Sequence, residues 1–550
     1  MKKSNSQRSA DFKTLLWIAS VCKGQLSLMV SVIVLGGFLA CFATVIAIIS
    51  KWILDSAQQG DSRRFIIFCT MLIVIAALQV LVGILSRYLT EKLHARLDIA
   101  FKKKVFGTIV LKSYSDIKNY HSGELVNRLT ADVSVITDAA TNLPVTVAST
   151  AVRIVCAFGA LVLLQPYFAF LFLAGGLIIY VITAMLRKRV KGLHKRMQKK
   201  EGKVRSFWQE ISENLLVIKS FGGEEMTVEK SRALMSDHYV VRMKKALLGA
   251  FSAGASQTVM RAGYIFALCY CAYKLLLRQM SFGTLTAITA LVNQVQTPFS
   301  SLSGVMPRYY AALSSAERLL ELEELSNEKE SGDVGDIGYD KFTKISAENL
   351  VFSYDKNKII DGLCFEIEKG DFVSVMGRSG IGKSTVFKLL LAIYETGGSI
   401  DFVFDGKRVA ACPATRSLFA YVPQGNLLFS GTIRENLLFL TGERSEEEIA
   451  FALKVACADE FIGSLPDGLE TQMGENGVGI SEGQAQRLAV ARAILSSRPI
   501  LLFDEATSAL DEQTEKQMLD NIKSLTDKTC IMVTHKNAAL EICNKNIVLK

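Results

Sequence analysis

The chain has 550 residues, which is enough for more than one domain, and half of its residues are hydrophobic. Its mean hydropathy of +0.28 is high for a soluble enzyme, and the apolar residues concentrate before about Met306. The net charge is +10, but no nucleic-acid-binding signature accompanies it and many Lys and Arg residues stand just outside apolar runs, so we expect no nucleic-acid partner.

Six apolar runs are each long enough to cross a hydrocarbon core of about 30 Å. The predicted spans are Leu26–Ser50, Phe65–Leu85, Leu143–Leu164, Tyr167–Leu186, Leu248–Tyr273 and Leu285–Met306. Long basic segments with helical spacing follow the second and fourth spans, whereas the other connections are short. This asymmetry predicts an integral protein of the cell (inner or plasma) membrane whose N-terminus and long segments lie in the cytoplasm.

Two arginines fall midway along predicted spans, Arg153 in the third and Arg261 in the fifth. A charge at the bilayer centre costs about 2.5–3.5 kcal/mol on insertion scales, so such residues usually face a cavity. We expect a polar, basic cavity for anionic or peptide-like cargo, with pairing between helices as the alternative. Four amide side chains are candidates to join it: Gln257, Asn293, Gln294 and Gln296.

The composition changes after the sixth span. We predict a transmembrane domain over residues 1–325, a linker over 326–341 and a nucleotide-binding domain over 342–550. The predicted fold class is a membrane α-helical bundle of six transmembrane helices fused to an α/β P-loop NTPase domain. The spacing of the 11 cysteines indicates neither a zinc site nor a disulfide framework, so we expect reduced thiols.

One glycine-rich stretch fits the phosphate-binding pattern G-x-x-x-x-G-K-[ST]. It comprises Gly377, Arg378, Ser379, Gly380, Ile381, Gly382, Lys383, Ser384 and Thr385. A predicted buried strand precedes it and a predicted helix follows, which is the context that the pattern requires. The glycines let backbone N–H groups converge on phosphate oxygens. Lys383 supplies a charge for the β- and γ-phosphates, and Ser384 supplies a hydroxyl for Mg²⁺.

An apolar predicted strand, Ile500–Phe503, ends in two acids, Asp504 and Glu505. Beside a phosphate loop, Asp504 suits Mg²⁺ and Glu505 suits the orientation or deprotonation of the attacking water. A further predicted strand ends at His535, where ligands bind in α/β sheets.

Two other segments add weaker indications of a nucleotide site. Ser481, Glu482, Gly483 and Gln484 form a polar turn that caps a predicted helix, which is either an ordinary cap or a second anion site for a nucleotide held by a partner chain. Tyr354 ends a predicted strand and is either a structural tyrosine or a platform for adenine.

With these motifs in order, the chain resembles the ATP-binding cassette (ABC) transporters, specifically exporter-type half-transporters with six spans ahead of one ATPase domain. The resemblance covers nearly the whole chain. It implies that residues 377–385 are Walker A, Leu501–Glu505 Walker B, Ser481–Gln484 the signature and Ser508–Asp511 the D-loop. It also implies that Tyr354 stacks on adenine, that Gln424 is the Q-loop residue and a third Mg²⁺ ligand, and that His535 is the switch histidine.

The resemblance implies a function as well as a fold. Two copies, or one copy and a relative, would sandwich each ATP between one chain's Walker A and the other's signature. We expect export of a drug-like, peptide or lipid substrate, with a lipid flippase or an ATP-gated channel or regulatory protein as alternatives. Glu505, His535 and Lys383 are the expected catalytic residues. The family pattern is altered at Ile480, Glu482 and Lys536.

Overall fold

The computed structural model describes residues 2–328, 337–354, 357–425, 428–474, 479–525, 527–534 and 536–549. For residues 2–10 and 296–304, and for several positions in the helix Pro166–Glu213, it describes the backbone course but not the side chains. Half of the predicted linker (residues 329–336) and His535 therefore lie outside the described residues.

The chain forms two compact units. The first unit contains Met1–Gly107 and Gly123–Glu323, and the second contains Thr108–Ser122 and Glu324–Lys550. A short segment from the N-terminal half thus belongs to the same unit as the C-terminal half.

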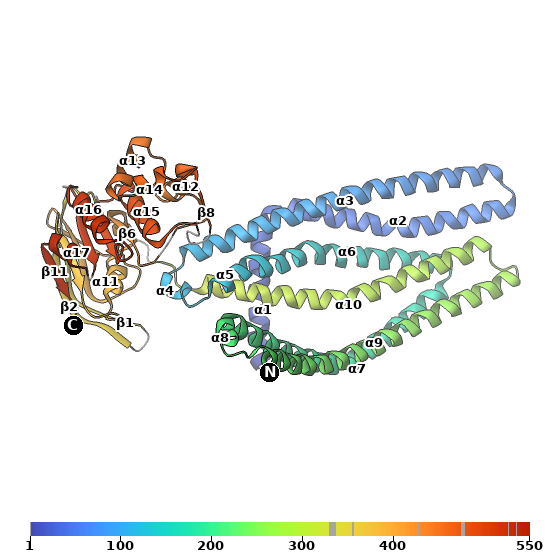
Figure 1. Cartoon of the computed structure of the whole chain (residues 1–550). Helices are drawn as coiled ribbons and strands as arrows, with labels where there is room; N and C mark the ends of the chain where they lie inside the picture. The colour runs from blue at the N-terminus through green and yellow to red at the C-terminus, as the bar shows by residue number, and fades with distance from the viewer. Residues whose placement is uncertain are drawn as a thin grey trace. The chain divides into compact units, whose positions relative to one another are not determined.

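The first unit consists of long helices, and four of the described ones, with 43 to 53 residues each, continue far beyond the length of a span (Figure 1). At 1.5 Å per residue, a helix of 50 residues is about 75 Å long, more than twice a hydrocarbon core. The predicted basic segments are therefore helical continuations of the spans rather than separate domains. The helices of this unit and their flanking turns are α1 (Lys2–Cys22), η1 (Lys23–Gln25), α2 (Leu26–Gln59), α3 (Ser62–Leu111), α5 (Ser122–Asn127), η2 (Arg128–Asp132), α6 (Val133–Leu164), α7 (Pro166–Glu213), α8 (Leu215–Ser220), α9 (Glu224–Leu276) and α10 (Phe282–Glu324).

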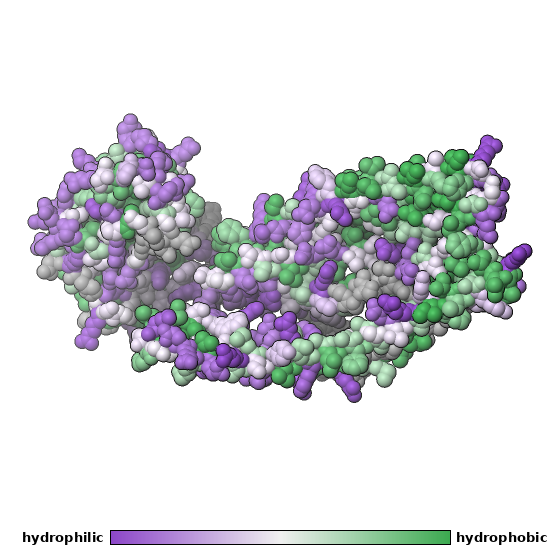
Figure 2. Space-filling view, turned by 45° about the vertical axis from the view of Figure 1, so that its right-hand side comes forward, coloured by the Kyte–Doolittle hydropathy of each residue, from purple (hydrophilic) through white to green (hydrophobic). Residues whose placement is uncertain are grey.

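Four stretches of described helix are long and apolar enough to cross a membrane: Asp11–Gln59, Ser62–Leu111, Ser122–Leu164 and Glu224–Leu276. A shorter apolar helix covers Phe282–Val295, where the sixth span is predicted, and the predicted fourth span lies in α7. Figure 2 shows hydrophobic side chains gathered over one end of the long helices and hydrophilic ones over the other.

Helices α2 and α6 pack closely within this unit because small residues let them approach. A Cβ added at Gly36 of α2 would lie 3.0 Å from Cγ1 of Val145 of α6. Gln294 of α10 donates to the backbone oxygen of Ala43 (2.7 Å) and accepts from the Thr44 hydroxyl (3.0 Å). For Gln294, therefore, the alternative of pairing between helices is correct.

The second unit contains two main sheets. The five-stranded sheet has the order β11-β3-β10-β9-β6, with every neighbouring pair parallel. The four-stranded sheet, β2-β1-β4-β5, is antiparallel. Parallel strands bring their carboxyl ends to one edge of the sheet, which places the ends of β3, β6, β9 and β10 side by side. The strands are β1 (Phe342–Tyr354), β2 (Asn357–Glu368), β3 (Phe372–Met376), β4 (Gly397–Phe404), β5 (Lys407–Ala410), β6 (Phe419–Val422), β7 (Gly431–Thr432), β8 (Gln472–Met473), β9 (Ile500–Asp504), β10 (Thr529–Val533) and β11 (Lys545–Val548).

Helices cover the parallel sheet, and buried side chains from both form its core. β9 and β10 are buried along their whole length, as expected for the centre of a parallel sheet. The helices of this unit are α4 (Tyr114–Ile117), α11 (Lys383–Leu390), η3 (Pro413–Leu418), α12 (Ile433–Leu438), α13 (Glu446–Val455), α14 (Asp459–Gly463), η4 (Gly468–Glu470), α15 (Glu482–Leu495), α16 (Glu512–Lys523) and α17 (Asn537–Ile542).

Candidate functional site

The glycine-rich loop connects β3 to α11, as the pattern predicts. Gly377, Gly380 and Gly382 have φ values of 155°, 79° and 113°, in the region that side chains with a Cβ rarely adopt. A Cβ at Gly382 would also lie 2.5 Å from Cγ2 of Ile359. Glycine is therefore required at Gly382 both for conformation and for space.

Lys383 is the first residue of α11, and its side chain turns back over its own loop. Its Nζ donates to the backbone oxygens of Gly377 (3.1 Å) and Arg378 (3.3 Å), and the residue is buried. This position holds the ammonium group inside the ring of backbone atoms from residues 377–382. A phosphate bound there would meet both the N-terminus of the helix and the lysine charge.

Asp504, at the end of β9, lies beside the loop. The Ser384 hydroxyl donates to its Oδ1 (3.0 Å), and the Tyr421 hydroxyl donates to its Oδ2 (3.2 Å). Asp504 is only 1% exposed, and burial raises the pKa of its carboxyl against the lowering effect of these two hydrogen bonds. Burial also raises the pKa of the Tyr421 hydroxyl, and the charge of Asp504 adds to this effect.

These oxygen atoms suit a hard divalent cation. A buried carboxylate and a neighbouring hydroxyl are ligands that Mg²⁺ accepts, and Mg²⁺ usually takes its remaining ligands from water and phosphate. Among the described residues no group of three or more His, Cys, Asp or Glu side chains is placed to hold a metal. A cation here would therefore complete its ligands with water or with phosphate oxygens.

Glu505 follows Asp504 and has a strained backbone, with φ of 54°. Its amide donates to the Val533 oxygen of β10 (3.1 Å), which holds the residue at the edge of the sheet. Gln424, two residues beyond β6, donates from Nε2 to Glu505 Oε2 (2.7 Å). Residues that are 81 positions apart are thus brought together beside the loop.

Tyr354 ends β1 and lies among other aromatic rings. Its ring is perpendicular to those of Phe352 and Tyr394, at centroid distances of 4.8 and 5.5 Å, and its hydroxyl lies 3.5 Å from Thr385 Oγ1. Lys118 Nζ lies 5.1 Å from the centre of the same ring. Tyr354, the candidate platform for adenine, therefore lies next to the loop, and a lysine from the N-terminal half lies over its ring.

The segment that carries Lys118 is hydrogen-bonded to the start of the C-terminal half. The amide of Ser113 donates to the Ser326 oxygen, and the Ser326 amide donates to Asp116, both at 3.0 Å. The ring of Tyr114 packs edge-on against Tyr394 at 6.1 Å. These contacts were not predicted, because nothing in the local pattern of residues 113–118 indicates a partner more than 200 residues away.

Ser481 is the N-cap of α15, and Gln484 completes a capping box with it: the Gln484 amide donates to Ser481 Oγ (3.3 Å) and the Ser481 amide donates to Gln484 Oε1 (2.8 Å). Ser481 and Glu482 are exposed. Within the described part of the chain, no hydrogen bond or ion pair connects Ser481–Gln484 to the loop at residues 377–385. Within this chain Ser481 therefore caps its own helix, and a role of this turn toward a nucleotide of a partner chain stays a prediction.

The turn after β9 packs tightly against α15. A Cβ at Gly483 would lie 2.9 Å from the Ala509 oxygen. Gln486 donates to Ser508 Oγ (3.0 Å) and accepts from the Ala509 amide (3.1 Å). Asp511 caps α16 by accepting from the Thr514 amide (2.9 Å), and this backbone hydrogen bond lowers the pKa of its carboxyl.

Lys536, which replaces the arginine common in the family, has a structural role at this turn. Its Nζ donates to the backbone oxygens of Thr507 (2.8 Å) and Leu510 (2.9 Å) and forms an ion pair with the buried Glu515 (3.2 Å). Neither Gln486 nor Lys536 was predicted to contact the turn, because both contacts depend on the tertiary fold.

Arg153 and Arg261, the candidates for a substrate cavity, lie on different helices. Arg153 on α6 is half-buried, and its Nε is shielded from solvent without a hydrogen-bond partner in the described part of the structure. Arg261 on α9 is exposed. No contact between the two side chains is present among the described residues.

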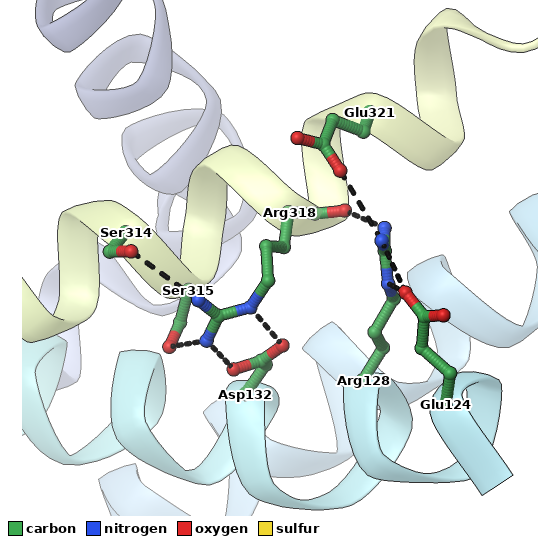
Figure 3. Close-up of polar contacts among 7 residues, drawn as sticks. All are labelled: Glu124, Arg128, Asp132, Ser314, Ser315, Arg318 and Glu321. Atoms are coloured by element: carbon green, nitrogen blue, oxygen red, sulfur yellow. Dashed lines mark hydrogen bonds and ion pairs between the residues drawn. The ribbon is translucent and has the colours of Figure 1, made fainter. Parts of the chain in front are cut away.

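A cluster of charges, in which Arg128 and Asp132 are buried, links η2 to the end of α10 (Figure 3). Arg128 donates to Glu124 Oε1 (2.8 Å), to Glu321 Oε2 (3.2 Å) and to the Arg318 backbone oxygen. Arg318 donates hydrogen bonds to both carboxylate oxygens of Asp132, and its Nε lies 2.9 Å from Oδ2. η2 is a π-helical turn, a feature that is frequent at functional sites.

A loop that can cradle phosphate, beside a buried aspartate at the edge of a parallel sheet, defines a P-loop nucleotide-binding domain that follows a helical membrane unit in the sequence. The description "ABC transporter transmembrane region" matches residues 26–299, and "ABC transporter" matches residues 360–508. This chain belongs to the ABC transporters: it is an integral membrane protein that binds ATP and couples its hydrolysis to transport, with one transmembrane region ahead of one ATP-binding region.

The chain is also similar to curated proteins over most of its length. It is 27% identical over 546 residues to the "ATP-dependent lipid A-core flippase" of Pasteurella multocida, covering 98% of this chain and 93% of that protein. The protein of the same description from Pseudomonas fluorescens (strain Pf0-1) is 29% identical over 489 residues, covering 87% and 80%. A solved bacterial Atm1-family ABC exporter with ATP bound has the same fold, with a TM-score of 0.78, 22% identity and 96% and 94% coverage.

The raised pKa of Asp504 predicts how its substitution changes stability. Its pKa is higher in the folded chain than in the unfolded chain, so the contribution of Asp504 to stability is complete below the unfolded pKa and is lost as pH rises through the folded pKa. Asp504→Asn keeps the shape and cannot ionise. We expect this variant to unfold at a higher temperature than the wild type without nucleotide at neutral pH, and the difference to shrink as pH falls.

Thermal unfolding of the nucleotide-free protein between pH 4 and 8 measures this effect. The same variant should hydrolyse ATP about a hundredfold or more slowly, because a neutral amide replaces the carboxylate at the cation site. A variant less stable than the wild type at every pH would contradict the assigned effect of burial.

Proposed function

We propose that this chain works as a dimer that uses ATP and Mg²⁺ to move a lipid or another amphiphile outward across the membrane. One observation carries the proposal: Ser384, Asp504, Gln424 and Glu505 are joined in pairs by hydrogen bonds beside the loop that holds Lys383. Phosphoryl transfer depends on positioning and on electrostatic stabilisation, and this arrangement offers both.

Each residue of the site has a role in this proposal. The loop amides and Lys383 hold the β- and γ-phosphates, while Tyr354 stacks on adenine. Ser384, Asp504 and Gln424 would hold Mg²⁺, which neutralises charge on the phosphates when bound. For Glu505 to act, Gln424 must release it, after which its carboxylate can accept a proton from the attacking water. His535 is proposed to act at the γ-phosphate.

Several exposed groups support a dimer. Ser481 and Glu482 stand at an exposed helix N-terminus that would meet the nucleotide of a second chain. The turn around α8 carries bare apolar side chains, with Leu216 83% and Phe221 85% exposed, and such residues mark interaction sites. The nucleotide-binding unit has an apolar patch of its own at Phe429, Phe439 and Leu440, where the ring centroids of Phe429 and Phe439 are 5.1 Å apart. We propose that α8 of one chain docks on this patch of the other, in a homodimer or with a related chain.

The relatives favour a lipid substrate over a drug-like molecule or a peptide, because the curated proteins that match most of the chain are described as lipid A-core flippases. Arg153 and Arg261 would supply positive charge for an acidic cargo. The nucleotide-binding unit would lie in the cytoplasm, at the inner or plasma membrane, following the distribution of basic residues.

Transport in proteoliposomes tests the proposal. The protein is reconstituted with its nucleotide-binding unit outside the vesicle. With ATP and Mg²⁺ added, we expect an acidic fluorescent lipid to move to the inner leaflet of the vesicle against its gradient. Passive movement down the gradient would instead indicate a channel. Lys383→Ala is the inactive control.

Arg153→Ala and Arg261→Ala should each slow transport of the acidic lipid about tenfold, because a lost charge-assisted hydrogen bond is worth about 1.5–3 kcal/mol. ATP hydrolysis without lipid should stay near the wild-type rate. Unchanged transport in both variants would remove these arginines from the substrate path and leave the ATPase assignment intact.

A further inference from the structure

A cavity of about 550 Å³ opens between α7 and α9, on a part of the first unit that the nucleotide site does not involve. The two helices lie side by side (Figure 1). The volume is within the range of small-molecule and head-group sites. The lining residues are Met197, Glu201, His238, Arg242, Lys245, Ala246 and Gly249.

Contacts across the two helices fix how they are aligned. Trp208 donates to Ser231 (2.8 Å), and Lys200 forms an ion pair with Asp237. Further along, Lys245 Nζ lies 3.1 Å from His194 Nδ1. As residue numbers fall on α7 they rise on α9, so the helices are antiparallel. Glu201 is therefore level with the His238 end of the cavity.

The lining residues of α9 share one face, since they are spaced by four, three, one and three positions from His238 to Gly249. This face extends about 16 Å along the helix axis. It begins in the charged part of α9 and ends at Gly249, just inside the apolar run Leu248–Tyr273. The cavity thus runs from the charged part of α9 to the start of the predicted fifth span.

The chemistry of the lining changes in a fixed order along this axis. A carboxylate, Glu201, stands at the aqueous end, and Arg242 and Lys245 follow one to two turns further in. The end nearest the apolar run has only the small residues Ala246 and Gly249. The order is therefore acid, base, apolar.

In the part of the chain that the structure describes, the charged side chains of the lining form no ion pairs. Among the described residues neither Glu201 nor Arg242 is in an ion pair, and Lys245 contacts only His194 and the sulfur of Met197 (4.0 Å). His238 Nε2 is shielded from solvent and has no hydrogen-bond partner in the described part of the chain. Of the charged residues nearby, Lys200 and Asp237 form an ion pair with each other, and Lys203 also lies close enough to act on Asp237.

We propose that this cavity binds the phosphoethanolamine head group of a membrane lipid. The ammonium group would meet Glu201, the phosphate would meet Arg242 and Lys245, and the glycerol and acyl chains would leave past Ala246 and Gly249. The His238 ring nitrogen can donate to a phosphate oxygen or accept from the ammonium, according to its tautomer. The assignment concerns binding to the nucleotide-free chain and does not depend on which lipid is transported.

Native mass spectrometry of the full-length, nucleotide-free protein tests this site. The probes are phosphatidylethanolamine, phosphatidylglycerol, phosphatidylcholine and soluble O-phosphoethanolamine, each added to delipidated protein. We expect phosphatidylethanolamine to bind about tenfold more tightly than phosphatidylglycerol, which lacks the ammonium, because a charge-assisted hydrogen bond to Glu201 is then missing. Phosphatidylcholine should bind more weakly than phosphatidylethanolamine, because its quaternary nitrogen has no N–H to donate.

Two sets of variants assign the binding to the cavity. Glu201→Gln should remove the preference for phosphatidylethanolamine over phosphatidylglycerol, whereas the double variant Arg242→Gln/Lys245→Gln should weaken both about tenfold or more. Glu229→Gln and Arg232→Gln are matched controls, since these residues form an exposed ion pair on α9 outside the cavity. Retained ATP hydrolysis shows that each variant is folded.

Three results would overturn the proposal. They are equal binding of phosphatidylethanolamine and phosphatidylglycerol to the wild type, a preference that survives Glu201→Gln, and soluble O-phosphoethanolamine binding as tightly as the lipid. The last would assign the cavity to a free metabolite instead. None of these outcomes bears on ATP-driven transport, whose failure would be seen separately in proteoliposomes.

Discussion

Glu505→Gln should lower the rate of ATP hydrolysis by about two to four orders of magnitude, the usual contribution of a general base. Binding of ATP should be nearly unchanged, because the amide keeps the shape of the side chain and can still pair with Gln424. Steady-state phosphate release measures the first effect, and equilibrium binding of a fluorescent ATP analogue measures the second.

The same variant gives a second result that depends on the dimer. With ATP and Mg²⁺ it should accumulate as a closed dimer, because nucleotide can bind but cannot be cleaved. Light scattering or crosslinking in detergent would detect the closed form. The control is Glu512→Gln, which changes an acid in the first turn of α16. Wild-type turnover in Glu505→Gln would remove this residue from catalysis.

Asp132→Asn should destabilise the helical unit by about 2 kcal/mol. Asp132 is 3% exposed and receives both Arg318 hydrogen bonds shown in Figure 3. Breaking a fully buried ion pair costs about 3–5 kcal/mol, and we expect less because the Arg318 side chain is 44% exposed and remains partly solvated. The midpoint of thermal unfolding in detergent should fall by about 4–8 °C.

Asp138→Asn is the matched control for this prediction. Asp138 lies on the same helix, but its side chain is 67% exposed and its partner is His94 at 3.1 Å. Exposed ion pairs contribute about 0–1 kcal/mol, so this variant should unfold close to the wild-type temperature. If both variants lowered the unfolding temperature equally, the ion pair of Asp132 with Arg318 would contribute no more stability than an exposed ion pair.

Local patterns predicted the parts of the site that are contiguous in sequence. The loop at residues 377–385 lies between β3 and α11, and Asp504 and Glu505 stand at the end of β9, because strand, turn and helix signals are all short-range. The long basic segments were also predicted as helical continuations of the spans, since their apolar spacing persists. These features depend on residues within about ten positions of each other.

Contacts between distant segments were not predictable in the same way. Tyr421 carries no sign that it will bond to Asp504, 83 residues later, until the parallel pairing of β6 and β9 is known. Arg128 belongs to a polar, basic segment, and nothing in that segment indicates burial. The side chain is nevertheless buried, because the end of α10 covers it. For Gln294 the sequence left a cavity and pairing between helices open, and the hydrogen bond to α2 shows the pairing.

The hydrogen bonds of Gln486 to the turn after β9 have a mechanical consequence. Since Gly483 also fits closely against Ala509, we expect the N-terminus of α15 and this turn to move together. A displacement of Ser481 caused by the nucleotide of a partner chain would move Ala509, which is only four residues from Glu505. The two ATP sites of such a dimer would then be coupled, so a substitution at one site would also change the rate of hydrolysis at the other.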